Sequence, residues 1–219
     1  MKDIILFDLD GTLTDPKEGI TKCVQYALAH FGIDVPNLDD LMCFIGPPLV
    51  DSFQMFYGFS EEKAEEAVVK YRERFKDIGI FENGVYDGVL EMLKACKAAG
   101  KTIGLATSTP EEFARRILDK YGMAEYFDEI TGSTMDGRIN AKGDVIMEAF
   151  RRMGIDDPDK KERVIMVGDR KHDIIGAKQC GIESIGVRFG YAEEGELEAA
   201  GADYIVDTVE ELKKLCINI

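Results

Sequence analysis

The chain has 219 residues, of which 45% are hydrophobic and 32% are charged, a composition typical of a folded globular protein rather than a disordered or fibrous one. Its 42 acidic residues outnumber its 27 basic residues and give a net charge of −15, which disfavours nucleic acid and anionic membranes as partners. An anionic substrate remains possible, because a local cluster of cations, backbone N–H groups or a metal ion overrides the general field.

The five cysteines are odd in number and scattered, so we expect reduced thiols and a cytoplasmic location. The N-terminal stretch contains aspartates where a signal peptide needs an unbroken apolar segment, and no run approaches about 18 apolar residues. We therefore expect neither export nor membrane spanning. The sequence leaves open whether the protein is a monomer or a homodimer.

Short apolar runs alternate with longer amphipathic segments along most of the chain. We predict strands at residues 4–8, 102–107, 129–133, 164–169, 184–189 and 204–207. We predict helices between them at residues 85–99, 110–121, 142–153, 173–180 and 208–216. Because most strand runs are apolar throughout, both faces of the sheet are expected to be covered. The pattern predicts an α/β domain with a doubly wound parallel sheet.

Residues 15–80 interrupt this alternation, because they show helical spacing with no convincing strand between the helices. Breaks rich in glycine and proline punctuate the stretch. We therefore predict two domains, an α/β core of residues 1–14 and 82–219 and a small helical insertion of residues 15–81.

The segment IILFDLDGTLTD, residues 4–15, ends the first predicted strand on two acids. Residues two apart on a strand point to the same side, so Asp8 and Asp10 can present both carboxylates in one place. Gly11 permits a sharp turn, and Thr12 adds a hydroxyl and an N–H. The carboxyl ends of strands are where open α/β sheets bind ligands, and paired carboxylates suit Mg²⁺. A solvated polar turn explains this segment, taken alone, equally well.

The segment LATSTPEEF ends the second core strand on Thr107 and Ser108. A hydroxyl beside a helix N-terminus is a ready site for a phosphate oxygen. The residues from Thr109 to Glu112 have the form of a capping box, with Pro110 as the first helical residue. A well-capped helix with no ligand is the simpler explanation of this segment.

Two later segments add charged side chains at comparable places. Lys142 precedes a predicted helix, where a cation could neutralise phosphoryl charge, although a lone lysine is usually a solvated surface group. The run VIMVGDRKHD ends a strand at Asp169, a candidate metal ligand, and Asp173 follows at the start of a helix, where it could hold the metal through water or orient its neighbours. Four such segments in this order have no shared structural explanation.

From FDLDGTLTD through ATSTP and Lys142 to GDRKHD, the chain resembles the haloacid dehalogenase-like superfamily of phosphohydrolases. Its tail, IGVRFGYAEEGEL, is similar to the phosphoglycolate phosphatase-like and 5′-nucleotidase-like branch. The resemblance implies a Rossmann-like core and makes the inserted helices a small cap of the C1 type. One departure is AKGD, where relatives often have Lys-Pro, which affects the local backbone more than the role of Lys142.

The resemblance implies that Asp8 is a nucleophile that attacks phosphorus. It implies that Asp10 protonates the leaving oxygen and then activates water. Mg²⁺ would be held by the Asp8 side chain, the Asp10 carbonyl oxygen and Asp169. The resemblance also implies that the phosphate is bound by Gly11, Thr107, Ser108 and Lys142. Of these, Thr107 and Lys142 would also stabilise charge as the phosphoryl group transfers. Thr12 and Asp173 would support the other site residues.

The implied activity is Mg²⁺-dependent hydrolysis of a small phosphate monoester, with phosphoglycolate as the first candidate. Asp10 favours phosphoryl chemistry over carbon–halogen cleavage, because dehalogenase relatives lack an acid there. Nucleoside 5′-monophosphates, pyrophosphate and a sugar phosphomutase reaction remain as alternatives. A phospho-acceptor signalling module is the non-enzymatic alternative, since it also combines an aspartate, Mg²⁺, a hydroxyl and a lysine on a parallel sheet. Such a module needs neither Asp10 nor a cap.

Overall fold

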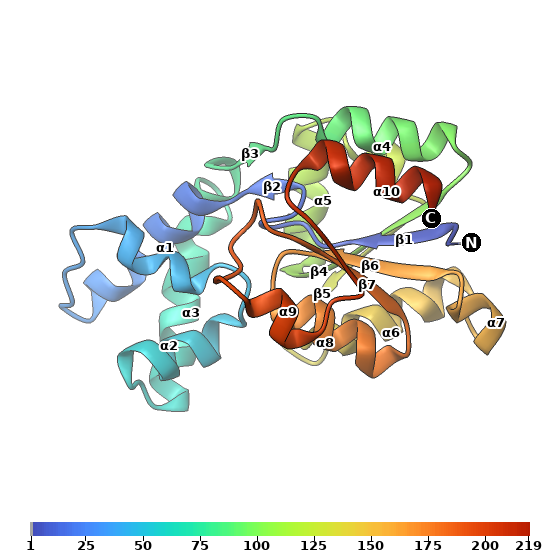
Figure 1. The fold of residues 1–219 in the computed structure, drawn as a ribbon. Helices are drawn as coiled ribbons and strands as arrows, with labels where there is room; N and C mark the ends of the chain where they lie inside the picture. Colours follow the sequence, from blue (N-terminus) through green and yellow to red (C-terminus); the bar gives the residue numbers. More distant parts are fainter. Residues whose placement is uncertain (1) are drawn as a thin grey trace. The chain divides into compact units, whose positions relative to one another are not determined.

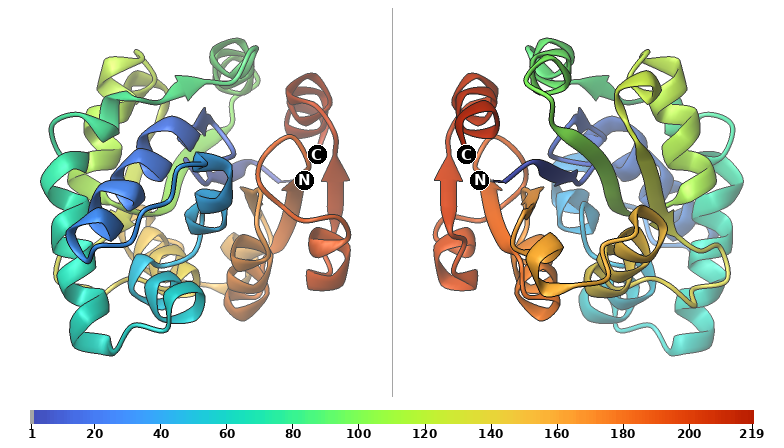
Figure 2. Two further views of the ribbon diagram at one scale, coloured as in Figure 1. Left: turned by 90° about the vertical axis from the view of Figure 1, so that its left-hand side faces the viewer. Right: turned by 90° about the vertical axis from the view of Figure 1, so that its right-hand side faces the viewer.

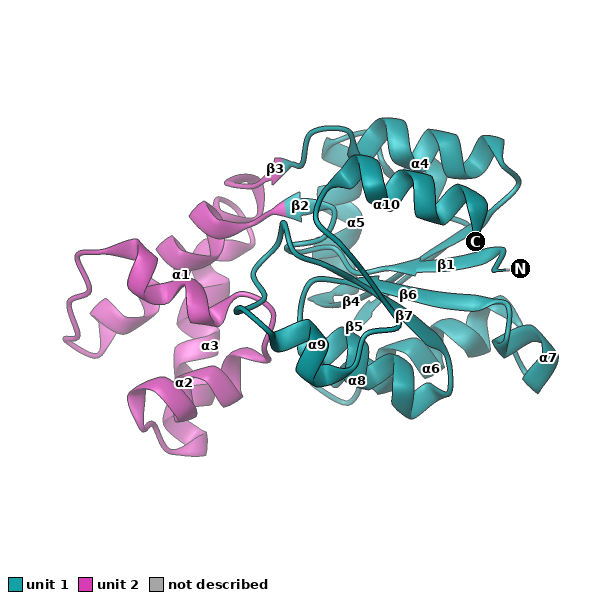
Figure 3. Ribbon diagram, viewed as in Figure 1, with its two compact units in different colours: residues 1–14, 85–219 teal, residues 15–84 magenta. Residues whose placement is uncertain are grey.

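The computed structural model describes residues 2–219, so Met1, which the predicted core includes, lies outside the described residues. The chain forms two compact units (Figure 3). The first unit consists of Met1–Thr14 and Val85–Ile219, and the second unit consists of Asp15–Gly84. It passes from one unit to the other at β2 (Thr14–Asp15) and at β3 (Gly84–Val85), which pair as a two-stranded sheet.

The first unit is built on a six-stranded parallel sheet with the order β5-β4-β1-β6-β7-β8 (Figure 1). The strands are β1 (Ile4–Phe7), β4 (Thr102–Pro110), β5 (Glu129–Ser133), β6 (Val164–Gly168), β7 (Glu183–Val187) and β8 (Tyr204–Val206). Their order and direction confirm the predicted doubly wound α/β fold.

Helices cover both faces of this sheet, as the apolar strand runs predicted (Figures 1 and 2). One face carries α4 (Val89–Ala98), α5 (Glu111–Lys120) and α10 (Val209–Asn218). The other face carries α6 (Lys142–Met153), α8 (Lys171–Cys180) and α9 (Glu196–Ala200). The short segments that the sequence did not predict include α9, η3 (Ala124–Tyr126), which is a 3₁₀ turn, and α7 (Pro158–Lys161).

The central strand β1 carries the core on both of its faces, because successive side chains of a strand point to opposite sides. Ile5, Leu6 and Phe7 are all fully buried. Leu6 belongs to a hydrophobic cluster with Ile146 and Phe150 of α6. The chain crosses from β1 to β4 on one side and from β5 back to β6 on the other, so the strand order reverses at β1. The carboxyl ends of β1, β4 and β6 therefore meet where such sheets bind ligands.

The second unit is helical, as its spacing predicted. Its elements are α1 (Lys17–His30), η1 (Leu38–Phe44), α2 (Leu49–Tyr57), α3 (Glu61–Phe75) and η2 (Gly79–Phe81). It has a core of its own, in which the rings of Phe44 and Phe53 pack edge to face with centroids 4.9 Å apart. Arg74 of α3 pairs with Glu82 at 2.6 Å. Within residues 2–219, no helix combines the length and the apolar character that crossing a membrane requires.

Phe150 tests the core of the first unit, because it is 2% exposed and belongs to the cluster beneath the sheet. We expect Phe150→Ala to lower the free energy of unfolding by about 3–5 kcal/mol, since it removes buried apolar surface and leaves a cavity. Met147 lies on the same helix but is 49% exposed, so Met147→Ala should change this free energy by less than about 1 kcal/mol. Urea unfolding of the two variants measures the difference, and equal losses would contradict this description of the core.

Candidate active site

The loop after β1 turns sharply and carries both predicted acids. The carbonyl oxygen of Leu9 accepts hydrogen bonds from the backbone N–H groups of Leu13 (2.9 Å) and Thr14 (3.0 Å), which closes the turn. Gly11 within it has φ 82°, in the left-handed region that favours glycine. A Cβ atom at Gly11 would lie 2.1 Å from Oδ2 of Asp169, so this position also needs glycine for the close approach. The turn therefore brings the β1 loop directly against the acid that follows β6.

Lys142 lies at the centre of the site, although lysines are almost never this buried without a partner. It is 7% exposed, and its Nζ lies 2.8 Å from Oδ1 of Asp8 and 2.8 Å from Oδ1 of Asp173. Nζ also donates a hydrogen bond to the carbonyl oxygen of Ala106 at 3.0 Å. Burial alone would lower the pKa of Lys142, but Asp173 and Asp8 raise it above its ordinary value. Lys142 is therefore held as a cation between three elements of the sheet domain.

Asp8, Asp169 and Asp173 form one buried acidic cluster. Each offers a carboxylate oxygen that lies within 4.8 Å of those offered by the other two. Asp169 directly follows β6, and its Oδ2 accepts a hydrogen bond from the backbone N–H of Tyr191 at 2.7 Å. Asp173 lies in the first turn of α8, where its Oδ2 accepts from the backbone N–H of Arg170 at 3.1 Å. The structure thus joins two predicted metal ligands, Asp8 and Asp169, with the predicted supporting acid.

This cluster fits a divalent cation. Oδ1 of Asp169 is buried and has no hydrogen-bond partner within residues 2–219. Four carboxyl groups are buried here, those of Asp8, Asp10, Asp169 and Asp173, and Lys142 forms ion pairs with two of them, Asp8 and Asp173. A divalent cation would balance the remaining negative charge. Burial and the neighbouring acids raise the pKa of Asp169 well above its ordinary value, as happens when a carboxylate lacks a compensating cation. Oxygen ligands of this kind suit Mg²⁺.

Asp10 occupies a different environment from the cluster. It is 9% exposed, and burial raises its pKa to about 6, with Asp8 contributing in the same direction. A hydrogen bond from Oγ1 of Thr109 to Oδ2 of Asp10, 2.5 Å long, opposes part of this increase. A carboxyl group that titrates near pH 6 can both donate and accept a proton near neutral pH. This environment supports the acid–base role implied for Asp10.

The segment after Thr107 differs from the prediction. Thr107 is buried within β4, three residues before its end, and Ser108 beside it is half-buried. The predicted capping box from Thr109 to Glu112 is wrong, because α5 begins at Glu111 with Pro110 at its N-cap and no side-chain cap. The Thr109 side chain bonds to Asp10 instead, since the tertiary fold brings that carboxyl group within its reach. Sequence reasoning therefore missed Thr109 as a site residue.

One ion pair beside the site could not be predicted from the sequence. Arg170 pairs with Glu196 at 3.0 Å, and the backbone N–H of Lys171 donates to the same carboxylate oxygen at 2.7 Å. This pairing fixes the start of α9 beside the loop after β6. Thr12 lies in the β1 loop as predicted, fully buried, and its hydroxyl has no hydrogen-bond partner in the described part of the chain.

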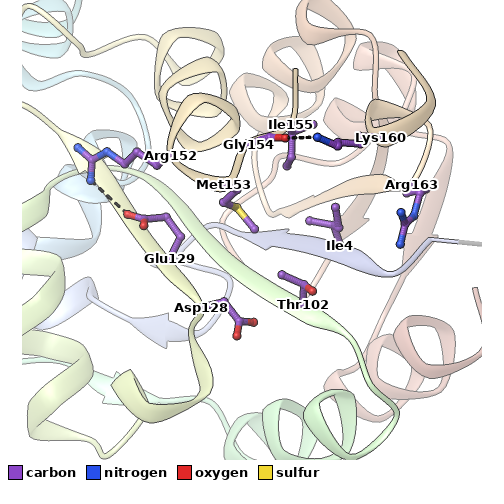
Figure 4. Close-up of a pocket in the computed structure, with 10 residues that line it drawn as sticks. All are labelled: Ile4, Thr102, Asp128, Glu129, Arg152, Met153, Gly154, Ile155, Lys160 and Arg163. Carbon is purple, nitrogen blue, oxygen red and sulfur yellow. Dashed lines mark hydrogen bonds and ion pairs between the residues drawn. The ribbon is translucent and has the colours of Figure 1, made fainter. Parts of the chain in front are cut away.

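A cavity of about 370 Å³ lies at the opposite edge of the sheet, beside the first residues of β1, β4 and β5 (Figure 4). Its charged groups already have partners. Arg152 lies 3.3 Å from Glu129, and Lys160 donates to the carbonyl oxygen of Gly154 at 2.7 Å. None of the predicted site residues lines this cavity. The buried acids and Lys142, rather than this cavity, therefore form the candidate active site.

Comparison with known proteins agrees with this geometry. A family model described as haloacid dehalogenase-like hydrolase matches residues 5–187, which confirms the resemblance seen in the sequence. The crystal structure of a predicted phosphatase from Clostridium acetobutylicum is 45% identical, covers 100% of both chains and superposes with a TM-score of 0.95.

Two of the similar sequences have names that state an enzyme activity. A 5′-nucleotidase of Pseudomonas aeruginosa is 48% identical over 195 residues, which cover 89% of this chain and 86% of the relative. The tyrosine-protein kinase PtkA of Mycobacterium tuberculosis is 35% identical over 213 residues, covering 96% of this chain and 71% of the relative.

The raised pKa of Asp10 predicts a stability difference that depends on pH. Because its pKa is higher in the folded protein, protonated Asp10 favours folding below about pH 4, and this contribution is lost as the pH rises through about 6. Because Asn cannot ionise, the free energy of unfolding of Asp10→Asn should be about 2–3 kcal/mol higher than that of the wild type at pH 8. At pH 4 the two free energies should be almost equal. Urea unfolding in the presence of a chelator, at pH 4 and at pH 8, measures these free energies. A difference that stays constant with pH would contradict the prediction.

Proposed function

Because the chain belongs to the haloacid dehalogenase-like hydrolase family and acts on phosphate esters, we propose that it hydrolyses small phosphate monoesters through a covalent phosphoryl group on Asp8. The observation that carries this proposal is the position of Asp8 at the end of β1. There the carboxylate lies 2.8 Å from the buried ammonium group of Lys142 and belongs to the acidic cluster. A nucleophile needs this fixed position and this charge environment.

In the first step, a carboxylate oxygen of Asp8 attacks phosphorus and the bond from phosphorus to the ester oxygen breaks. The proton of Asp10 passes to the departing oxygen, so an alcohol leaves. In the second step, Asp10 takes a proton from water, the water oxygen bonds to phosphorus, and the bond from phosphorus to Asp8 breaks. Inorganic phosphate leaves, and both aspartates return to their starting states.

The chain's own groups would hold the phosphate during both steps. The Thr107 hydroxyl and the Ser108 N–H are donors near the carboxyl end of β4. The N–H of Gly11 donates to the carbonyl oxygen of Thr14 at 2.7 Å, so Gly11 would contribute by letting the phosphate approach the β1 loop closely. Lys142 adds a positive charge that cannot move away, because Asp8, Asp173 and the Ala106 carbonyl oxygen hold it. Donors held in advance stabilise a transferring phosphoryl group without having to reorganise.

Mg²⁺ would be held by the Asp8 side chain, the Asp10 carbonyl oxygen and Asp169, with Asp173 close by. It would supply neutralisation of the charge shared by the phosphate and the acids. The unpartnered Oδ1 of Asp169 supports this assignment. The role of the helical unit as a cap and the cytoplasmic location stay predictions.

Two substrate classes have separate support. Phosphoglycolate is the first candidate from the sequence, through the resemblance of the C-terminal tail. The name of the 48% identical relative favours a nucleoside 5′-monophosphate as the second. Both present the same phosphate dianion to Asp8, so the part of the substrate beyond the phosphate decides between them.

Asp8→Asn tests the nucleophile. We expect kcat for p-nitrophenyl phosphate to fall by roughly 10⁴-fold or more, because an amide cannot attack phosphorus, while the protein stays folded. Asp15→Asn is the matched control, since Asp15 is an exposed acid in the same segment and lies outside the acidic cluster. Release of inorganic phosphate is the measurement, with circular dichroism to check folding. Substantial turnover by folded Asp8→Asn would overturn the nucleophile assignment.

A substrate panel tests the activity itself. We expect release of inorganic phosphate from one class of monoester at a kcat/KM at least about tenfold above the others, and loss of that activity when Mg²⁺ is removed with a chelator. The panel contains phosphoglycolate, nucleoside 5′-monophosphates, pyrophosphate and sugar phosphates. Formation of a sugar phosphate isomer, or transfer of the phosphoryl group to a protein, in place of free phosphate would contradict the proposed hydrolysis.

A further inference from the structure

Thr109 makes contacts with two of the groups that the proposed mechanism uses. Its Oγ1 donates a hydrogen bond to Oδ2 of Asp10, with 2.5 Å between the two oxygens. Its backbone N–H donates to Oγ1 of Thr107 at 3.2 Å. One residue of β4 therefore fixes both the proposed acid–base group and the hydroxyl proposed to bind phosphate.

The backbone around Thr109 is itself tightly constrained. β4 continues in extended conformation as far as Pro110, and its register against β5 shifts between Thr107 and Pro110. The residue before a proline disfavours the helical conformation, which keeps Thr109 extended. Gly132 of β5 allows the two strands to come this close, because a Cβ atom there would lie 2.6 Å from the carbonyl oxygen of Thr109. Thr109 is thus placed by the fold and not by a local helix cap.

These contacts decide which atoms of Asp10 and Thr107 remain free to act on the substrate. The Thr109 hydroxyl occupies Oδ2 of Asp10, which leaves Oδ1 to exchange a proton with the substrate. Oγ1 of Thr107 accepts from Thr109, so its own proton remains available for a phosphate oxygen. Threonine suits this task, because branching at Cβ limits the side chain to few rotamers and little freedom is lost when it is fixed.

We propose that Thr109 is a positioning residue that orients the carboxyl group of Asp10 towards the leaving oxygen of the substrate. This inference rests on the proposed function, because it needs Asp10 to deliver a proton to that oxygen. In this role Thr109 acts through its hydrogen bond to Asp10 and not through contact with the substrate. Its contribution should therefore be largest for substrates whose leaving oxygen most needs a proton.

Leaving-group dependence separates this role from a merely structural one. A nitrophenolate leaves with little help from an acid, whereas an alkoxide needs a proton as it departs. We expect Thr109→Val, which keeps the shape but loses the hydroxyl, to lower kcat/KM for an alkyl phosphate by about 10- to 100-fold. For p-nitrophenyl phosphate, the loss should be less than about threefold. Thr109→Ser retains a hydroxyl and should restore most of the alkyl phosphate activity.

The experiment compares kcat/KM for p-nitrophenyl phosphate and for the better of phosphoglycolate and adenosine 5′-monophosphate. It is run on the wild type, Thr109→Val, Thr109→Ser and Asp10→Asn, with unfolding curves for each. Thr109→Ala removes the same hydroxyl with a smaller side chain and replaces Thr109→Val in the comparison if valine disturbs folding.

The inference is supported if the hydroxyl-free variant loses alkyl phosphate activity selectively, as Asp10→Asn does more strongly, and Thr109→Ser regains it. Suppose that Asp10→Asn loses alkyl phosphate activity selectively. The inference is then overturned if a folded hydroxyl-free variant loses equal activity on both substrates, or loses none. If Asp10→Asn itself shows no selectivity, the acid role in the proposed function fails, and the inference fails with it.

Discussion

The buried ammonium group of Lys142 is the interaction on which the rest of the site depends. It connects Asp8 after β1, Asp173 in α8 and the carbonyl oxygen of Ala106 in β4, so one cation links three separate segments of the chain. Its charge offsets part of the repulsion among the acids, and in a low-dielectric interior that offset is large. Without it, Asp8 and Asp173 would lose the cation that both of them contact.

The buried acids lie in an environment that disfavours their charged forms. Burial raises the pKa values of Asp10 and Asp173 to about 6, and burial together with the neighbouring acids raises that of Asp169 well above its ordinary value. The fold therefore keeps these carboxyl groups where their charged forms are disfavoured. Stability for this arrangement comes from elsewhere, chiefly from the apolar strands β1 and β6 and from the cluster around Phe150. Such local cost is characteristic of sites where a group must change its protonation state during a reaction.

Much of the fold was predictable, because its signals are local and repeated. The apolar runs gave the six core strands to within a few residues, and α6 begins and ends at the predicted residues 142 and 153. The AKGD departure leaves this helix intact, since Lys142 is its first residue. The short segments α7 and α9 were not predicted, because four or five residues carry too little periodicity. The long end of β4 was also missed, because threonine, proline and two glutamates match the pattern of a helix start.

The sequence by itself determined which residue types stand near the strand ends: two acids after the first strand, hydroxyls near the end of the second, a lysine at the start of α6, and an acid after β6. Those identities follow from local pattern, because a strand ends where polar residues replace apolar ones. Only the tertiary structure decided how they meet. It showed that the carboxylate of Asp173, and not that of Asp10, joins the cluster with Asp8 and Asp169, and that Thr109 bonds to Asp10. The physical reason is that a side chain takes the strongest partner within reach. Strand order and helix packing bring together residues that are far apart in the sequence, and so decide which partners are within reach.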